Sequence, residues 1–309
     1  MSEKTAFVFP GQGSQTVGML ADFASAYPQL LDTFAEASDV LGYDLWALAQ
    51  SGPQEKLNLT EITQPLLLTS SVAIWRIWCE KGGEKPQLFA GHSLGEYSAL
   101  VCSGVIPFVA AVDLVRQRGS FMQAAVPVGA GAMAAVLGLD DNVVVDICQS
   151  LTGEANVVEA VNFNSPGQIV IAGHAGAVEQ ASAALKEAGA KRVAPLPVSA
   201  PFHTSLMKPA GDALAEIMQS IEFQAPQIPV IHNVHAKPES NPEEIRKLMV
   251  EQTSSAVQWT QCVQYMVAQG IEKTIECGPG KVLSGLSRRI HKPLQVANLE
   301  SPESFNEFF

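Results

Sequence analysis

Short apolar runs that end in turn residues alternate with longer segments of helical periodicity in the first part of this chain. One run, residues 5–9, ends at Pro10 and a glycine-rich loop, and a second, residues 87–91, ends at a turn that contains Ser93. A helix opens near Pro65, which takes its first helical position. The helical patterns cover about residues 16–41, 43–50, 63–81, 97–102 and 107–126. Strands that feed helices in this way predict a parallel sheet with helices on both faces.

The pattern changes at residue 127, where strands and helices become shorter. Strands are predicted at 131–138, 157–163, 168–173 and 191–197, and helices at 140–150 and 175–188. This βαββαβ order is the ferredoxin-like unit. Further helices and strands follow at 204–220, 228–232, 242–252, 259–269, 271–276 and 281–290. We therefore expect an α/β protein whose large subdomain, residues 1–127 and 199–309, carries an inserted small subdomain, residues 128–198.

Composition narrows the class of protein. The 309 residues are 47% hydrophobic, which is enough for a sizeable core. The net charge of −12 argues against nucleic acid and against anionic membranes as partners. The first apolar run is too short for a signal peptide, and no uncharged stretch reaches membrane-spanning length. The five cysteines form no C-x-x-C pair and predict buried thiols, so we expect a cytoplasmic protein.

Ser93 lies in Gly91-His-Ser-Leu-Gly95, between a predicted strand and a predicted helix. This is the pattern of a nucleophile elbow, in which the serine stands at the apex of a sharp turn and the free N–H groups of the following helix face it. Gly91 and Gly95 suit such a turn because a Cβ would clash with the neighbouring backbone. The pattern is also compatible with a tight turn that carries a solvated hydroxyl.

A serine nucleophile needs a base, and His203 is the strongest candidate among six histidines. It lies where the chain returns from the small subdomain and a helix begins, so the helix dipole should keep its ring neutral. His92 is a weaker candidate because it neighbours Ser93 in the chain. The alternative is that His203 only caps a helix. No carboxylate lies close in sequence to orient its ring, since Asp212 is more than two turns away.

Arg118 is placed on the apolar face of its predicted helix, in line with Leu114 and Met122. Arg116 lies on the solvated side, where Asp113 can pair with it. A buried guanidinium must meet an anion, because an unpaired buried charge is very unfavourable. Its partner is either a structural carboxylate or a substrate carboxylate held by the bidentate fork.

The loop Gly11-Gln-Gly-Ser-Gln15 fails the dinucleotide-binding pattern, because residue 16 is not glycine. In enzymes with a nucleophile elbow, one oxyanion N–H comes from the residue after the nucleophile and another from a different strand-end loop. Leu94 and Gln12 can fill these two places.

Six motifs in this order resemble the malonyl-CoA:acyl carrier protein transacylases of bacterial type II fatty acid synthesis. They are Pro10-Gly-Gln-Gly-Ser-Gln15, Gly91-His-Ser-Leu-Gly-Glu-Tyr97, Arg118-Gly119, Asn162-Phe-Asn-Ser-Pro-Gly-Gln168, Pro201-Phe-His203 and Gly278-Pro-Gly280. The resemblance covers about residues 5–299. It implies a large subdomain like an α/β-hydrolase and a small ferredoxin-like one. Acyltransferase domains of polyketide synthases are more distant relatives.

The resemblance also implies roles for individual residues. Ser93 would be acylated, His203 would be its base, and Arg118 would bind the malonyl carboxylate. The N–H groups of Gln12 and Leu94 would form the oxyanion hole. In this family a main-chain carbonyl orients the histidine, and the matching residue here is Gln252. Phe202 resembles the residue of malonyl-selective polyketide acyltransferases, whose ring occupies the space that an α-methyl group would need.

The activity implied is a ping-pong transfer of malonyl from malonyl-CoA to the phosphopantetheine thiol of acyl carrier protein. No metal or redox cofactor is expected, and we expect a monomer. Two other functions stay open on sequence alone: a serine hydrolase, and a non-catalytic carrier-binding module. Because carrier proteins are acidic, docking needs a local basic patch. The candidates are Lys191, Arg192, Lys208, Lys281, Arg288, Arg289 and Lys292.

Overall fold

The computed structural model describes residues 3–198 and 200–309 and contains two separate sheets. The larger sheet has the order β7-β2-β1-β8-β9, and every neighbouring pair is parallel. Its strands are β1 (Thr5–Phe9), β2 (Leu88–Gly91), β7 (Val230–Ile231), β8 (Lys273–Glu276) and β9 (Gln295–Asn298). The prediction of an α/β fold with a parallel sheet is therefore confirmed.

The two faces of the larger sheet pack against different helices. On β1, Phe7 and Phe9 point into the core with the helices that follow β1 and β2, whereas Ala6 and Val8 pack with the C-terminal helices. The first set of helices is α1 (Ala21–Ala26), α2 (Leu30–Leu41), α3 (Leu45–Ser51), α4 (Gln54–Leu57), α5 (Thr60–Glu80), α6 (Leu94–Cys102) and α7 (Phe108–Ala124). Because strand side chains alternate between faces, both faces of this strand are buried and apolar.

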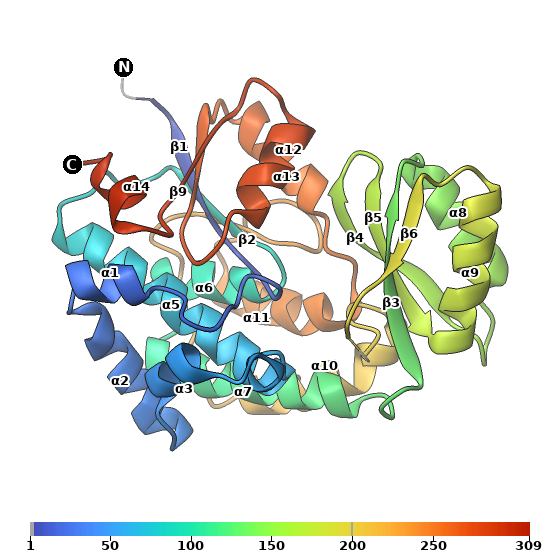
Figure 1. Cartoon of the computed structure of the whole chain (residues 1–309), viewed down its shortest axis with the longest axis horizontal. Coiled ribbons are helices and arrows are strands. Elements are labelled where there is room, and N and C mark those ends of the chain that lie inside the picture. Colours follow the sequence, from blue (N-terminus) through green and yellow to red (C-terminus); the bar gives the residue numbers. More distant parts are fainter. Residues whose placement is uncertain (1–2, 199) are drawn as a thin grey trace.

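The C-terminal part of the chain supplies helices to both of these clusters, and they lie at several places around the sheet (Figure 1). They are η1, a 3-10 helix (Ser205–Met207), α10 (Lys208–Met218), α11 (Pro242–Glu251), η2, a 3-10 helix (Gln252–Ser254), α12 (Trp259–Ala268), α13 (Val282–Ile290) and α14 (Pro302–Asn306). Among these, α12 and α13 cover the face that carries Ala6 and Val8. Buried side chains of α10, α11 and α14 instead join the cluster that contains Phe7 and Phe9.

The smaller sheet is antiparallel and lies to one side of the larger body, with α8 and α9 on its outer face (Figure 1). Its strand order is β4-β5-β3-β6, which is the order of a ferredoxin-like unit. The elements are β3 (Gly131–Leu137), α8 (Asp141–Leu151), β4 (Val158–Ser165), β5 (Gln168–His174), α9 (Ala175–Glu187) and β6 (Arg192–Pro195). The predicted βαββαβ unit is therefore confirmed. The predicted subdomain boundary at residue 199 falls on a residue outside the described ranges.

Two helix predictions were wrong in detail, and both involve a proline. The helix expected over 16–41 is divided into α1 and α2 around Pro28, because the residue before a proline is driven out of the helical region, and Tyr27 has φ −131° and ψ 78°. Pro65 does not open α5 but lies inside it, since the helix begins at Thr60. The helical hydrogen bond that Pro65 cannot donate would have gone to the carbonyl of Glu61, an exposed residue.

Other elements differ from the pattern in smaller ways. The sequence did not predict α4, β9 or α14, each of which has five residues or fewer. Cys79 is exposed rather than buried, because it lies in the last turn of α5, and all five cysteines are free thiols. Across the described residues, no helix combines the length with the hydropathy that a bilayer span requires.

Candidate active site

Ser93 stands in a strained turn between β2 and α6, at the carboxyl edge of the parallel sheet. Its φ of 53° and ψ of −105° are unusual for a residue with a side chain. The turn is crowded: a Cβ on Gly91 would lie 1.9 Å from the carbonyl carbon of Gly95, and one on Gly95 would lie 1.9 Å from the main-chain oxygen of Phe9. The glycines are therefore required by close backbone contact, as the sequence predicted.

The fold brings His203 to Ser93 from the segment that leaves the smaller sheet. The Nε2 atom of His203 lies 2.7 Å from Oγ of Ser93, and its Nδ1 lies 2.9 Å from the main-chain oxygen of Gln252. The carbonyl fixes the proton on Nδ1, so Nε2 is left free to accept one. This geometry is that of a nucleophile, a base and a group that orients the base.

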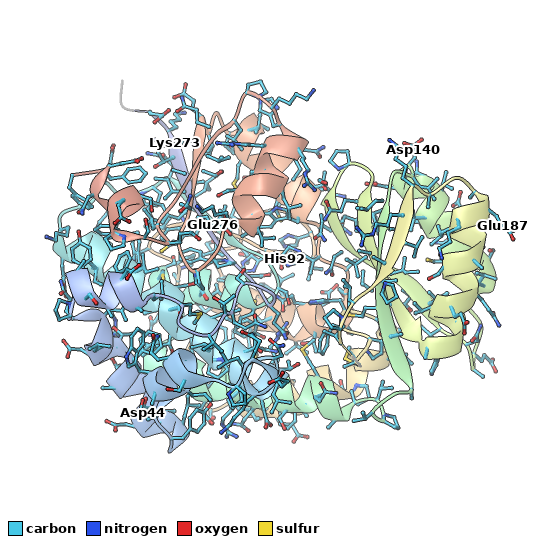
Figure 2. All side chains as sticks on the ribbon, viewed as in Figure 1. Asp44, His92, Asp140, Glu187, Lys273 and Glu276 are labelled. Atoms are coloured by element: carbon cyan, nitrogen blue, oxygen red, sulfur yellow. The ribbon has the colours of Figure 1, made fainter. Side chains whose placement is uncertain are left out.

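His92 is turned away from this pair. Its Nε2 lies 2.8 Å from Oδ1 of Asn164, and its ring packs beside Trp259 with centroids 5.8 Å apart. In Figure 2 His92 lies near the centre of the molecule, between the larger body and the smaller sheet. Adjacency in sequence to Ser93 therefore does not make His92 its partner.

The ring of His203 is neutral for a different reason from the one that the sequence suggested. Burial, which is the largest cause, and the nearby charge of Arg118 lower its pKa to about 3. The helix dipole is not the cause, because His203 stands in a left-handed turn with φ 65°, two residues before the short η1. The prediction of a neutral ring holds, but burial rather than the dipole produces it.

This shifted pKa predicts an acid-sensitive contribution to stability. Between pH 6.5 and about 3 the unfolded chain protonates His203 while the folded protein does not, so the free energy of unfolding falls as the pH decreases through that window. Above pH 6.5 the contribution is complete. Urea unfolding at pH 7 and at about pH 4.5 should show a larger loss for the wild type than for His203→Gln. Equal losses would contradict the assignment.

Arg118 is fully buried and is held by neutral oxygens. One of its terminal nitrogens donates to Oε1 of Gln64 at 2.9 Å; the other donates to Oε1 of Gln252 at 2.8 Å and to Oγ of Ser93 at 3.3 Å. Its guanidinium lies 5.1 Å from the ring centroid of Tyr97. Within residues 3–198 and 200–309 no carboxylate forms an ion pair with it, whereas Arg116 pairs with Asp113 at 2.7 Å. The alternative of a structural carboxylate partner is therefore wrong.

The other predicted residues surround the serine. Gln12, Phe202, Ser93 and His203 line one cavity of about 130 Å³. Leu94 is the first residue of α6, directly after the serine. Neither the Gln12 nor the Leu94 main-chain N–H donates to another described residue, so both are available to a ligand. These positions are compatible with an oxyanion hole, which stays a prediction.

Three neighbouring side chains were missed by sequence reasoning: Gln64, Glu96 and Asn233. All three are buried. The signal for Glu96 was available, because it is an acidic residue in the apolar start of α6, where an unpaired carboxylate would be unfavourable. Nothing in the sequence marks Gln64 or Asn233. In the described part of the chain, no group of three or more His, Cys, Asp or Glu side chains is placed to hold a metal ion.

This chain is similar to known proteins over nearly its whole length. A family model, the acyl transferase domain, matches residues 6–301. The malonyl CoA-acyl carrier protein transacylase of Escherichia coli K12 is 60% identical over 299 residues, which are 97% of this chain and 96% of that protein. A crystal structure of an acyl carrier protein S-malonyltransferase from Vibrio cholerae has a TM-score of 0.97 at 57% identity and covers 99% of both chains. A malonyl-transacylase solved with its type II polyketide acyl-carrier protein has a TM-score of 0.97 at 55% identity and covers 98% of both.

Proposed function

Because this chain belongs to the acyl transferase domain family, we propose that it moves the malonyl group from malonyl-CoA to the phosphopantetheine thiol of acyl carrier protein, for use in fatty acid elongation. One observation carries the proposal. The Ser93–His203 pair lies beside a buried guanidinium, that of Arg118, which has no carboxylate partner among the described residues. Such a site suits a thioester whose acyl group carries its own carboxylate.

The first half of the reaction acylates the serine. His203 Nε2 accepts the hydroxyl proton while Ser93 Oγ forms a bond to the thioester carbonyl of malonyl-CoA. The N–H groups of Gln12 and Leu94 stabilise the tetrahedral oxyanion, and a donor of this kind contributes about 3 kcal/mol. When the intermediate collapses, the carbon–sulfur bond breaks, and the CoA sulfur leaves with the proton from His203. The enzyme then carries malonyl as an ester on Ser93.

The second half runs the same steps in reverse order with a different thiol. His203 takes the proton of the phosphopantetheine thiol, and its sulfur attacks the ester carbonyl. Collapse breaks the bond to Ser93 Oγ, which recovers the proton from His203. Each step uses a hydroxyl, an imidazole, main-chain donors and a guanidinium. We therefore propose that no resident cofactor takes part, since the phosphopantetheine arrives on the carrier.

Acyl selectivity is assigned to two residues. Arg118 favours an acyl group with a terminal carboxylate, because an acetyl group would leave its charge unpaired in a buried site. Phe202 is buried and lines the same cavity as Ser93, and its ring would occupy the space of an α-methyl group. Comparing malonyl-CoA with methylmalonyl-CoA as donors for Phe202→Ala tests the second assignment.

The subdomain division, residues 1–127 with 199–309 and residues 128–198, is proposed on the two sheets. The smaller sheet has an apolar core of its own, built by side chains of β3, β4, β5, α8 and α9. We expect the protein to be a monomer and to reside in the cytoplasm. Sedimentation at several protein concentrations tests the oligomeric state.

The carrier docking patch is proposed along α13 and the segment after it. Lys281 is partly neutralised, because its Nζ lies 2.5 Å from a carboxylate oxygen of Glu300. Arg288, Arg289 and Lys292 are exposed, and Arg289 donates to Gln168 across to the smaller sheet. The three other candidates, Lys191, Arg192 and Lys208, are also exposed. We place the patch on α13 because two arginines are adjacent there and because α13 lies next to the cavity that contains Gln12 and His92.

Charge reversal at Arg288 and Arg289 together is expected to raise the KM for acyl carrier protein about tenfold and to leave kcat nearly unchanged, because exposed charges steer association more than they affect chemistry. The effect should shrink as salt is added. Steady-state kinetics with varied carrier protein measure it. The matched control reverses Lys81 and Lys85, which changes the net charge equally at the end of α5. An unchanged KM in the arginine variant would exclude this patch.

Intact and peptide mass spectrometry after brief exposure to malonyl-CoA, without acceptor, tests the proposed function. The expected result is one malonyl group on Ser93, which then moves to added holo acyl carrier protein. Rapid loss to water with no carrier product would instead indicate a serine hydrolase. Absence of any acylation would indicate a carrier-binding module without catalysis.

A further inference from the structure

The side-chain amide of Asn233 holds both sides of the nucleophile turn. Its Oδ1 accepts a hydrogen bond from the main-chain N–H of Ser93 at 2.7 Å, and its Nδ2 donates to the main-chain oxygen of Gly91 at 2.7 Å. The orientation of the amide is fixed by chemistry, because a main-chain N–H can only donate and a carbonyl can only accept. Asn233 comes from the loop after β7, about 140 residues beyond the serine.

Asn233 is itself anchored to the helix that Ser93 begins. Its main-chain N–H donates to Oε2 of Glu96 at 3.0 Å, and His232 places Nδ1 2.7 Å from Oε1 of the same carboxylate. Glu96 also accepts from Nε2 of Gln252 at 2.8 Å. Asn233, Glu96 and His232 are fully buried. Each hydrogen bond therefore lies in an environment where its loss leaves a polar group without water.

Gln252 completes the same arrangement from the other side of the serine. Its Nε2 donates to the main-chain oxygen of Ser93 at 2.9 Å, while its own main-chain oxygen faces Nδ1 of His203. Both main-chain polar groups of Ser93 are thus bonded to side chains from other segments. A backbone with φ of 53° persists only where its surroundings over-determine it.

We propose that Asn233 is a positioning residue for the transfer reaction. It holds the strained turn so that Oγ of Ser93 stays within hydrogen-bonding distance of Nε2 of His203 and the N–H of Leu94 faces the reacting carbonyl. The inference rests on the proposed function, because it concerns the same nucleophile. Without the two amide hydrogen bonds, the peptide before Ser93 can rotate toward a relaxed conformation and carry the hydroxyl away from the base. A displacement of about 1 Å at a reacting group can lower the rate about 100-fold.

Two substitutions test this role. Asn233→Ala removes both amide hydrogen bonds. Asn233→Asp keeps an acceptor for the Ser93 N–H but sets a carboxylate oxygen against the carbonyl oxygen of Gly91. This second variant still tests the role if the alanine variant does not fold. The matched control is Asn241→Ala, because Asn241 also uses its side chain to accept two main-chain N–H groups, those of Glu243 and Glu244, but at the exposed start of α11.

The measurements are kcat and KM for malonyl-CoA, the rate of Ser93 labelling by a fluorophosphonate, and the folded fraction by circular dichroism. We expect both Asn233 variants to lose about 100-fold in kcat and in labelling rate per folded molecule, with KM within about twofold of the wild type. Asn241→Ala should lower Tm and leave both rates unchanged.

Rates per folded molecule that stay within twofold of the wild type in either Asn233 variant would overturn the inference, and so would a loss confined to KM. Acylation of the wild type by malonyl-CoA distinguishes failure of this inference from failure of the proposed function. If the unmodified protein takes no malonyl group from malonyl-CoA, the transfer proposal itself is wrong, whatever the Asn233 variants do.

Discussion

Replacing Ser93 by alanine is expected to reduce malonyl transfer by a factor on the order of 10⁶ and to abolish the malonyl-enzyme. A rate loss of this size is expected when a serine enzyme loses its nucleophile. His203→Ala should cause a loss of similar order, because Oγ without the base 2.7 Å away remains protonated and unreactive. The double variant should be no worse than either single variant, since the two groups act as one unit. The measurement is kcat/KM for malonyl-CoA, together with mass spectrometry of the protein.

Ser98→Ala serves as the control for the serine substitution. Ser98 lies on α6, the helix that follows Ser93, and its buried hydroxyl has no hydrogen-bond partner among the described residues, so its removal should leave kcat/KM unchanged. A double variant whose loss equals the product of the two single losses would show that Ser93 and His203 act independently. The 2.7 Å contact would then have no catalytic meaning.

Arg118→Ala is expected to lower kcat/KM for malonyl-CoA about a thousand-fold while transfer from acetyl-CoA survives or rises. Removing one partner of a buried ion pair costs about 4 kcal/mol, which corresponds to that factor. An acetyl group has no carboxylate to pair with Arg118, so its transfer is favoured when the unpaired charge of Arg118 is removed. The malonyl-to-acetyl ratio is measured within one preparation, so the folded fraction cancels.

Arg116→Ala is the matched control, because Arg116 lies two residues earlier on α7 and pairs with Asp113 at the surface. An exposed pair of this kind contributes little, and both acyl donors should react as with the wild type. If Arg118→Ala lowers malonyl and acetyl transfer equally, Arg118 supports the structure of the site and does not recognise the acyl carboxylate. Its hydrogen bonds to Gln64 and Gln252 would then explain the loss.

The elements that the sequence predicted well are those whose stability depends on local pattern. The βαββαβ order and most of its bounds follow from alternating apolar positions and from turn residues such as Gly167, which has a φ of 72°. One of the errors concerns the start of α5. Pro65 is favourable at a helix start, but the packing of nearly every residue of α5 into the core extends the helix one turn before it. Tertiary burial thus overrides a local preference.

The features of the candidate site also fall into those that local sequence predicts and those that depend on tertiary contacts. The elbow around Ser93 and the placement of Arg118 on an apolar face could be predicted, because each depends on spacing within a single segment. The neutral state of His203 was predicted for the wrong reason, since its burial is produced by segments distant in sequence. The role of the Gln252 side chain, which joins Arg118, Ser93 and Glu96, has no sequence signal at all.

What the sequence by itself determined is the chemistry available: a serine in a glycine-flanked turn, a histidine, a guanidinium on an apolar helix face, and the order of strands and helices that carries them. Periodicity and turn preferences act over a few residues, so one chain segment is enough to reveal them. Only the tertiary structure decided which histidine meets the serine, what neutralises it, and which amides hold the turn. These depend on contacts between segments more than a hundred residues apart, and burial there sets both pKa and geometry.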